Sequence, residues 1–355
     1  MNKYFSADFL EGFIKDILAT YKVNSEDSSI IAEALICANL MGHDSHGIVH
    51  LPEHFSYIPG FESKMVNTQP HIKIEQNTPT ITSVDGDRGL GIIGLYKGME
   101  LALNSAKDSG MGMAVVKNCY HAGALSYYTR KIADQGMIGI ALVNTARLVA
   151  PPMGKKRAIG TNPISIGIPY HPNRPLLLDM ATSVVASGKI EIARREGEKV
   201  PKGLIVDNEG RGTTNPDDYF NNGALLPLGG SPETGGYKGY GLGVMFDVLT
   251  GILSGLGHGM SINKEDGQAH TLLILNKDMV LSQDKFTKKM EDMVQDLHSI
   301  PTLNEQEILV PGELEWRSYE KRLETGIPLN KEVLFSLKRL AEKRELNNYV
   351  KYFEI

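Results

Sequence analysis

The chain has 355 residues, with 37 basic and 42 acidic side chains and a formal net charge of −5. This length suits two or three domains, since one domain takes roughly 100–200 residues. The hydrophobic fraction of 41% and the charged fraction of 22% are ordinary for a folded chain and argue against disorder and a membrane class. Basic and acidic residues are intermixed, which argues against nucleic acid as a partner. Glycine, with 37 residues, exceeds the usual ~7%, so its positions should mark functional turns.

The two cysteines, Cys37 and Cys119, are too few for a disulfide framework or a cysteine zinc site. We therefore expect a reducing, cytoplasmic compartment. Asp8 and Glu11 interrupt the start of the chain where a signal peptide needs its apolar core, so no export segment is expected. The apolar stretch 239–262 contains Asp247 and several glycines. We interpret it as a buried helix that ends in a loop, with no membrane span.

The start of the chain predicts two helices. The first has Ser6 as N-cap and an apolar stripe at four-residue spacing. The stripe comprises Phe9, Leu10, Phe13, Ile14, Ile17 and Leu18. A second stripe, from Ile30 to Ala38, predicts a helix that starts at Asn24 or Ser25.

The middle of the chain predicts a β-rich α/β region. Short apolar runs bounded by Gly, Pro and Asn indicate strands. These runs are 80–84, 113–116, 138–143, 164–168, 176–178 and 271–275. Helices are expected at 96–107 and 124–133, with the buried helix at 242–253. Apolar stripes at 286–297 and 333–341 then predict helices near the end, so terminal helices should clasp the α/β middle.

Four histidines cluster at positions 43, 46, 50 and 54. On one helix, this spacing would stack them on a single face as metal ligands. Pro52 prevents a helix from running through to His54, however, and Gly47 weakens its middle. Three interpretations stay open: a metal site, surface or structural histidines, and a functional His46 in a Ser45-His46-Gly47 turn.

His121 follows the predicted strand 113–116 and precedes an Ala-Gly-Ala turn. A titratable group at a strand end beside a glycine turn is a common active-site position in α/β proteins. A structural or capping role explains the same pattern equally well.

Two glycine-rich segments resemble nucleotide-binding loops. The run 89–94 reads G-x-G-x-x-G, but Asp85 to Arg88 separate it from the preceding strand, and the next strand ends without the acid that would hold a ribose. We interpret it as a loop before a helix. The run 235–243 has Lys238 between glycines, a pattern suited to a phosphate or carboxylate at a helix start.

These motifs occur in a fixed order, and the order resembles one protein family. They are SHG, an HxGAxxYY segment, PPMG, GTNP, LLLDMATSVVASGK, DNEGRGTTNP, LPLGG, GYKGYGL and VPGE. The sequence from about residue 6 to 345 is similar to the malate/L-lactate dehydrogenase family of NAD(P)-dependent oxidoreductases. That family is unrelated to the Rossmann-fold lactate and malate dehydrogenases.

The resemblance implies a non-Rossmann α/β fold of the L-sulfolactate dehydrogenase type. A central mixed β-sheet domain binds the cofactor, and the N- and C-terminal helices pack together. The expected divisions are an N-terminal helical segment at 1–75, a central nucleotide- and substrate-binding region at 76–280, and C-terminal helices at 281–355. A homodimer with the active site near its interface is also implied.

The resemblance places the NAD or NADP contacts on a set of residues that we expect to lie together. They are Thr161, Pro175, Leu176, Leu177, Leu178, Asp179, Met180, Ala181, Tyr237, Lys238, Gly312, Glu313 and Leu314. From its position alone, Asp179 could instead cap the next helix.

The family's proposed proton donors fall on His46 in some members and His121 in others. Hydride addition to a 2-oxo acid leaves an alkoxide, and a histidine can supply its proton and take it back. The sequence does not choose between the two. Asn144 and Thr145 are expected to line the substrate pocket.

One position departs from the family pattern. Many members read S-H-G-x-x-R, where the arginine is suited to a bidentate contact with a carboxylate. Here that position is His50, and Ser45 and His50 are still expected to contact the substrate. Three interpretations stay open: a weaker carboxylate contact by His50, a pH-dependent one, or a contact handed to another cation. Arg147, or Lys155 and Lys156, are the candidate replacements. Arg174, before the Pro175 stretch, is a candidate contact to the 2′-phosphate of NADP.

The sequence thus predicts a dehydrogenase that interconverts a small 2-hydroxy acid and its 2-oxo acid. Two alternatives stay open: a metal-dependent hydrolase or lyase that uses His43, His46 and His50, and a protein that binds the cofactor without turnover. The expected partner is a small-molecule acid, with no nucleic acid and no membrane.

Overall fold

The protein is described by a computed structural model that covers residues 2–52, 57–172, 174–262 and 266–354. His54, one of the four clustered histidines, lies outside these ranges. The helices are α1 (Ala7–Thr20), α2 (Ser25–Leu40), α3 (Tyr57–Glu62), α4 (Gly91–Ser109), α5 (Ser126–Ala133), α6 (Ser187–Glu196), α7 (Pro216–Phe220), α8 (Gly236–Asp247), α9 (Gln283–His298), α10 (Glu313–Thr325), α11 (Lys331–Lys343) and α12 (Asn347–Val350).

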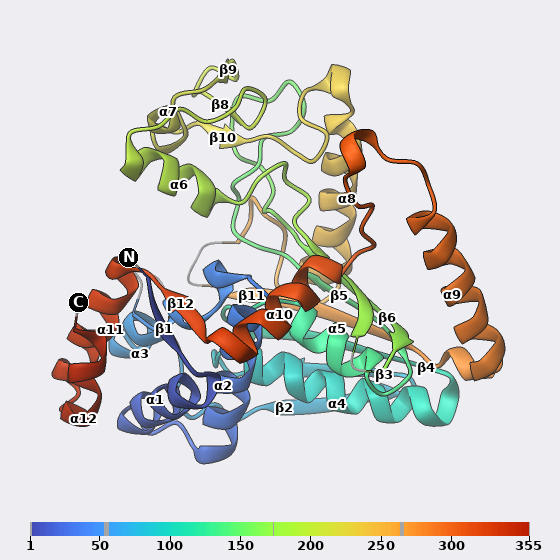
Figure 1. Cartoon of the computed structure of the whole chain (residues 1–355), viewed down its shortest axis with the longest axis horizontal. Helices are drawn as coiled ribbons and strands as arrows, with labels where there is room; N and C mark the ends of the chain where they lie inside the picture. Colours follow the sequence, from blue (N-terminus) through green and yellow to red (C-terminus); the bar gives the residue numbers. More distant parts are fainter. Residues whose placement is uncertain (1, 53–56, 173, 263–265, 355) are drawn as a thin grey trace.

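A seven-stranded mixed sheet forms the centre of the molecule (Figure 1), in the order β2-β3-β4-β11-β5-β6-β7. Its strands are β2 (Lys73–Thr78), β3 (Ile81–Asp85), β4 (Met111–Cys119), β5 (Ile138–Val143), β6 (Ile164–His171), β7 (Arg174–Met180) and β11 (Gln268–Leu275). Only β3 and β4 pair in parallel, and the other neighbouring strands are antiparallel. The predicted strands and the mixed, non-Rossmann fold class are therefore confirmed.

The literal G-x-G-x-x-G run belongs to the start of α4. A Cβ on Gly91 would lie 2.1 Å from the carbonyl oxygen of Tyr120, and one on Gly94 would lie 2.7 Å from Sγ of Cys119. These glycines thus let the helix approach the end of β4 closely. The expectation of a loop before a helix holds only for Gly89 and Leu90, because α4 begins at Gly91 and the later glycines serve helix packing.

The two ends of the chain pack together beside the sheet (Figure 1). Strand β1 (Lys3–Phe5) pairs antiparallel with β12 (Ile327–Leu329), and the rings of Phe13 and Phe353 are 4.8 Å apart. Ser6 caps α1 by accepting a hydrogen bond from the backbone N–H of Phe9, and Asn24 caps α2. The predicted association of the terminal helices is confirmed, and Asn24 is the cap of the second helix.

A small lobe stands above the sheet (Figure 1), and the sequence did not predict it. It holds α6, α7 and a three-stranded sheet of β8 (Ile205–Val206), β9 (Gly212–Thr213) and β10 (Ala224–Leu225). Buried Val149, Ile190, Ile205, Tyr219 and Leu225 form a core separate from the main one. Its strands are only two residues long, so they leave no alternating pattern in the sequence.

The expected burial of the helix at 242–253 is wrong. The segment is helical, as α8 and a following π-helical turn (Val248–Ile252), but many of its apolar side chains are exposed. Examples are Leu242, Met245, Leu249, Ile252 and Leu253, each 44–55% accessible. An apolar run shows that a segment favours an apolar environment, but not which molecule provides it. Here the described part of this chain does not cover these side chains.

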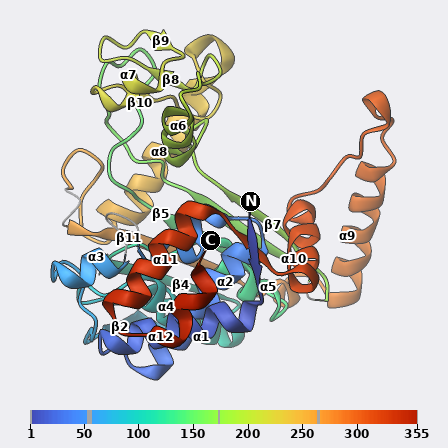
Figure 2. The ribbon, with the colours of Figure 1, turned by 60° about the vertical axis from the view of Figure 1, so that its left-hand side comes forward.

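Helix α9 extends away from the body of the molecule (Figure 2). Its stripe buries Met290 and Val294, whereas Met293 and Leu297 are exposed. Within the described ranges, no helix is both long and apolar enough to cross a membrane.

Candidate active site

The SHG motif folds as two short 3₁₀ turns after α2, Asp44–His46 and Ile48–His50. Asn39, near the end of α2, holds both turns: its amide nitrogen donates to Oδ1 of Asp44 at 2.8 Å, and its oxygen accepts from the N–H of Ile48 at 2.8 Å. A Cβ on Gly47 would lie 2.2 Å from that oxygen, so glycine is required where the two turns meet. The predicted helix break is confirmed, and His46 and His50 are placed by a buried amide.

Three histidine rings come together from two distant parts of the chain. The rings of His50 and His121 stack with centroids 4.2 Å apart, and the His46 ring lies 5.6 Å from His121 and 5.8 Å from His50. His121 lies two residues past the end of β4, and the SHG turns follow α2. The cluster therefore joins both histidines proposed as proton donors with the residue that departs from the family pattern.

Hydrogen bonds define which nitrogens of these rings can act. The backbone N–H of Gly123 donates to Nδ1 of His121 at 3.2 Å, and the hydroxyl of Tyr57 lies 3.3 Å from the same nitrogen. In the neutral ring this assigns the proton to Nε2. In His46, Nδ1 lies 3.0 Å from Oγ of Ser45, which leaves Nε2 for a ligand.

Burial lowers the pKa of each histidine in the cluster, but not under the same influences. The pKa of His50 falls to about 3, through burial and then the neighbouring His46. The pKa of His121 falls well below its ordinary value, through burial and then through His50 and other histidines. Burial also lowers the pKa of His46, but the charge of Asp179 opposes that effect. His46 is thus the member of the cluster whose protonated form a carboxylate supports.

Asp179 lies in β7, and its carboxylate accepts a hydrogen bond from the N–H of Ser126, the first residue of α5, at 2.7 Å. The alternative, in which Asp179 caps the helix that follows it, is wrong. The helix whose first N–H it binds is α5, which precedes it in the chain. The negative charge of the same carboxylate acts to raise the pKa of His46. Asp179 therefore connects the strand assigned to the cofactor with the histidine cluster.

Asn144 and Thr145 follow β5. Asn144 is fully buried: its side-chain oxygen accepts from the N–H of Ala269 at 2.8 Å, and its Nδ2 has no hydrogen-bond partner in the described structure. Oγ1 of Thr145 accepts from the N–H of Thr161 at 2.9 Å. These contacts join Thr145 to Thr161, a residue expected to contact the cofactor.

The candidate replacement cations differ in their surroundings. Arg147 is exposed, and no ion pair involves it within the described residues. Lys155 is paired with Glu209 at 3.1 Å, and the exposed Arg174 is paired with Glu320 of α10. Arg147 and the exposed Lys156 are therefore the candidates that no ion pair compensates within the described part of the chain.

Two of the segments assigned to the cofactor lie against each other. The N–H of Leu177 donates to the carbonyl of Pro311 at 3.1 Å, and Nε1 of Trp316 donates to the carbonyl of Pro175 at 2.9 Å. Gly312 has φ of +101°, and a Cβ there would lie 2.9 Å from the nitrogen of Leu177. The turn that contains Glu313 and leads to the exposed Leu314 thus packs on β7, the terminal strand of the sheet.

The two faces of β7 differ. Leu177 is buried in the main core, whereas Leu176, Leu178, Met180 and the following Ala181 are half-buried. Tyr237 and Lys238 are exposed in the first turn of α8, after Gly235 with φ of +98°. The segments assigned to the cofactor thus include a half-exposed apolar face on β7. They also include an exposed lysine in the first turn of α8.

The histidines do not converge as a metal site. His43 turns away, with Nε2 3.9 Å from Glu315 of α10. Over the part of the chain that the structure describes, no group of three or more His, Cys, Asp or Glu side chains is placed to hold a metal ion.

Sequence reasoning missed His270, in β11. The side chain is fully buried, and neither ring nitrogen has a hydrogen-bond partner among the described residues. His270 also contributes to the lowered pKa of His121. The one available signal was a histidine directly before the predicted strand 271–275, a pattern that a structural histidine also gives.

Comparison with known proteins identifies the family. The model of the malate/L-lactate dehydrogenase family matches residues 5–338. The malate dehydrogenase of Pyrococcus horikoshii is 39% identical over 95% of this chain and 94% of its own length. The L-sulfolactate dehydrogenase of Methanocaldococcus jannaschii is 34% identical over 94% of this chain and 95% of its own. The crystal structure of malate dehydrogenase from Entamoeba histolytica superposes with a TM-score of 0.93, at 29% identity, over 97% of this chain and 99% of that chain.

The mixed-sheet fold and the matched relatives define a non-Rossmann dehydrogenase. The chain belongs to the malate/L-lactate dehydrogenase family. It is an NAD(P)-dependent oxidoreductase that interconverts a 2-hydroxy acid and the corresponding 2-oxo acid. Membership therefore favours the dehydrogenase over the two alternatives that the sequence left open.

Proposed function

We propose that the cluster of His46, His50 and His121 is the catalytic site, and that His46 carries the proton. The observation that carries this assignment is the position of Asp179, whose charge favours a protonated His46 while its carboxylate is held by the N–H of Ser126. In reduction, Nε2 of a protonated His46 gives its proton to the oxygen at the second carbon of the substrate. In oxidation, the neutral ring takes that proton back.

His121 has a different role in this proposal. Its Nδ1 accepts from the N–H of Gly123, so its Nε2–H is a hydrogen-bond donor even when the ring is neutral. A neutral donor can polarise the oxo group and then hold the developing alkoxide. His121 therefore orients the reacting oxygen, and His46 exchanges the proton with it.

The substrate carboxylate is assigned to His50 and Arg147. Burial lowers the pKa of His50 to about 3, so its ring lies beside the carboxylate as a neutral polar group and adds no charge. Arg147 supplies a charge from the loop after β5. Ser45, Asn144 and Thr145 complete the proposed pocket. This arrangement fits a small 2-hydroxy acid of the kind named for the relatives, malate or sulfolactate.

The residues present fit a nicotinamide nucleotide. The half-exposed side chains of Leu176, Leu178 and Met180 offer an apolar surface for a flat ring. The glycine-led start of α8, with Lys238, offers N–H groups and a cation suited to phosphate. When bound, the cofactor supplies or accepts the hydride.

We infer a preference for NAD over NADP. Arg174 lies directly before the Pro175–Ala181 stretch, and its charge is already compensated by Glu320. A 2′-phosphate at this point would meet a carboxylate as well as the cation.

A second copy of the chain is proposed to cover α8. The exposed apolar side chains run along its length and through the following π-helical turn. Exposed apolar patches of this kind mark interfaces, and a homodimer is the assembly that the resemblance implies.

The two buried free cysteines support a reducing, cytoplasmic location. Boundaries near residues 75 and 280 remain our proposal for the domain organisation.

The experiment that tests the function follows nicotinamide absorbance. Purified protein is mixed with NADH or NADPH and a panel of 2-oxo acids that includes oxaloacetate, pyruvate and sulfopyruvate. We expect oxidation of the nicotinamide with at least one acid, and faster with NADH. No absorbance change with any acid and either cofactor would refute the proposal.

A further inference from the structure

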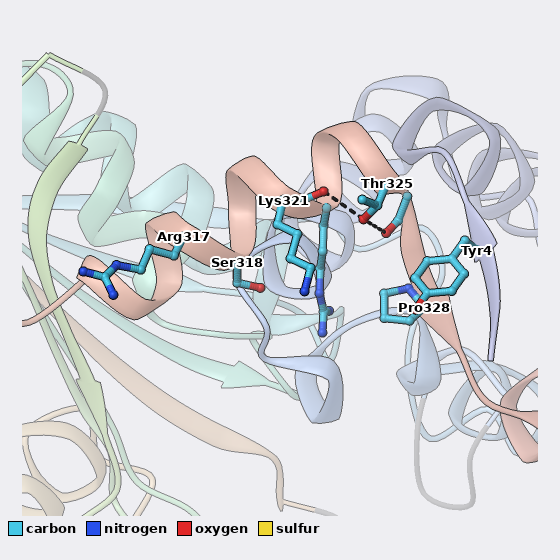
Figure 3. A pocket seen from close by; sticks show the side chains of 8 residues that line it. Tyr4, Arg317, Ser318, Lys321, Thr325 and Pro328 are labelled. Carbon is cyan, nitrogen blue, oxygen red and sulfur yellow. Dashed lines mark hydrogen bonds between the residues drawn. The ribbon is translucent and has the colours of Figure 1, made fainter. Parts of the chain in front are cut away.

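A cavity of about 350 Å³ lies between α10 and the β1–β12 pair, away from the histidine cluster. Its size is within the range of small-ligand pockets. Figure 3 shows Tyr4 and Pro328 together at one end of the pocket, Arg317 at the other, and Ser318 and Lys321 between them. The residues that line it are Tyr4, Arg317, Ser318, Lys321, Arg322, Thr325, Gly326 and Pro328.

The lining is basic. It has three cationic side chains, Arg317, Lys321 and Arg322, and no acidic side chain. Arg317 is paired outside the lining with Glu307 at 2.6 Å. Lys321 is exposed and has no ion pair in the described part of the chain, so its charge is uncompensated. The pocket therefore favours an anion.

The remaining lining gives the anion further partners. Tyr4 is 58% exposed, and its hydroxyl makes no hydrogen bond within the described ranges. Its ring and Pro328 form an apolar wall (Figure 3). The hydroxyls of Ser318 and Thr325 are already donated to the carbonyls of Leu40 and Lys321. Lys321 and Tyr4 are thus the lining donors that no hydrogen bond or ion pair occupies in the described part of the chain.

Arg322 connects this pocket to the active site. Its two terminal nitrogens donate to the two carboxylate oxygens of Asp44, at 2.6 and 2.9 Å, and one of them also donates to the carbonyl of Asn39. Asp44 is the first residue of the turn that ends at His46. Asn39 is the residue that holds both SHG turns. The guanidinium therefore ties α10 to the segment that places His46 and His50.

We propose that this pocket binds a small oxyanion, and that the bound anion slows catalysis by drawing Arg322 away from Asp44. An arginine pairs with carboxylate or phosphate in the same bidentate geometry, so an oxyanion beside Lys321 competes directly with Asp44. Loss of that pair releases the turn before His46. A displacement of about 1 Å at a catalytic group is enough to reduce the rate about 10²-fold.

Binding is tested by thermal unfolding and calorimetry of the full-length protein without cofactor. Inorganic phosphate tests an oxyanion alone, and butyrate tests a carboxylate with an apolar body for the wall of Tyr4 and Pro328. Sodium chloride at equal ionic strength is the reference. We expect at least one anion to raise the Tm, and the anion that binds more tightly identifies the source of the oxyanion.

Lys321→Met removes the free charge from the pocket, and Lys107→Met is the matched control, since Lys107 is exposed on α4 with no ion pair in the described structure. Lys321→Met should weaken anion binding about tenfold or more, and Lys107→Met should leave it unchanged. Equal binding by the wild type and both variants, or no binding of either anion to the wild type, overturns the proposal. Lys321→Gln repeats the test should the methionine variant fold poorly.

The effect on the active site is tested separately, by turnover with and without the bound anion. We expect the anion to lower kcat in the wild type and in Lys107→Met, but not in Lys321→Met, whose basal rate should be that of the wild type. Arg322→Lys, which cannot make the bidentate pair, should lower basal kcat and remove the remaining response. Anion binding at the pocket with no change in kcat would overturn the coupling. Binding is measured without substrate, so its outcome is independent of the proposed reaction.

Discussion

Gly47→Ala is the substitution that tests the construction of the SHG turn most severely. The new Cβ would lie 2.2, 2.3 and 2.5 Å from three side-chain atoms of Asn39, far inside van der Waals contact. Since Asn39 is 1% exposed, its amide cannot move without breaking its bonds to Asp44 and to the N–H of Ile48. Losing one hydrogen bond costs about 1 kcal/mol, and a buried N–H left unsatisfied costs about 1–3 kcal/mol.

The expected loss of stability is therefore about 2–4 kcal/mol by these values, measured by urea unfolding. Because the turn places His46 and His50, kcat/KM should fall about 10²-fold. Asn39→Ala alone should lose the same two hydrogen bonds and be destabilised by a similar amount.

The double variant separates the clash from other effects. In the Asn39→Ala background the side chain that Gly47→Ala strikes is absent, so adding the alanine at 47 should cost little more. A double-mutant cycle should therefore give a large coupling between the two positions. Additive losses, or wild-type stability and rate in Gly47→Ala, would refute the reasoning.

Three further predictions concern the charges and the interface. Asp179→Asn removes the charge that raises the pKa of His46. The pKa should therefore fall further, and the decline of the reductive kcat/KM with rising pH should move to lower pH; an unmoved profile would count against His46 as the proton carrier. Glu320→Gln frees Arg174 from its ion pair and should lower the KM for NADPH severalfold relative to NADH, as initial rates would show; an unchanged ratio would remove Arg174 from the cofactor site. Leu249→Asp in the exposed π-helical turn should shift a homodimer to monomers in light scattering, whereas Met279→Asp, at a more exposed position elsewhere, should not; a dimer that survives the first change does not use this face.

The sequence was most informative where local rules act alone. Ser6 and Asn24 were predictable as caps because a side-chain oxygen beside an apolar stripe is a local signal. The strands were predictable from short apolar runs between turn residues. The two-residue strands of the small lobe were not, because they are too short for periodicity to register.

The burial of α8 and of the π-helical turn after it was mispredicted for a different reason. Hydropathy reports the preference of a segment for an apolar environment and does not say which molecule supplies it. Leu249 and Ile252 are as apolar as core residues, yet both are about half exposed.

The candidate site likewise combines features that local sequence rules predict with features that depend on tertiary packing. The SHG motif and His121 could be singled out from residue types and turns. The stacking of His50 on His121 could not, because it depends on how the fold brings the segments after α2 and β4 together. The roles of Asp179 and Arg322 were beyond sequence reasoning because each acts on the SHG segment from more than a hundred residues away in the chain.

The most direct test of the central claim compares the wild type with His46→Gln. The cofactor contacts proposed here do not involve His46, so nucleotide binding, measured by fluorescence titration, should match the wild type. Reduction of the best 2-oxo acid should fall about 10²- to 10⁴-fold, the usual contribution of a positioned general acid. A rate within a few-fold of the wild type would contradict the assignment of the proton to His46.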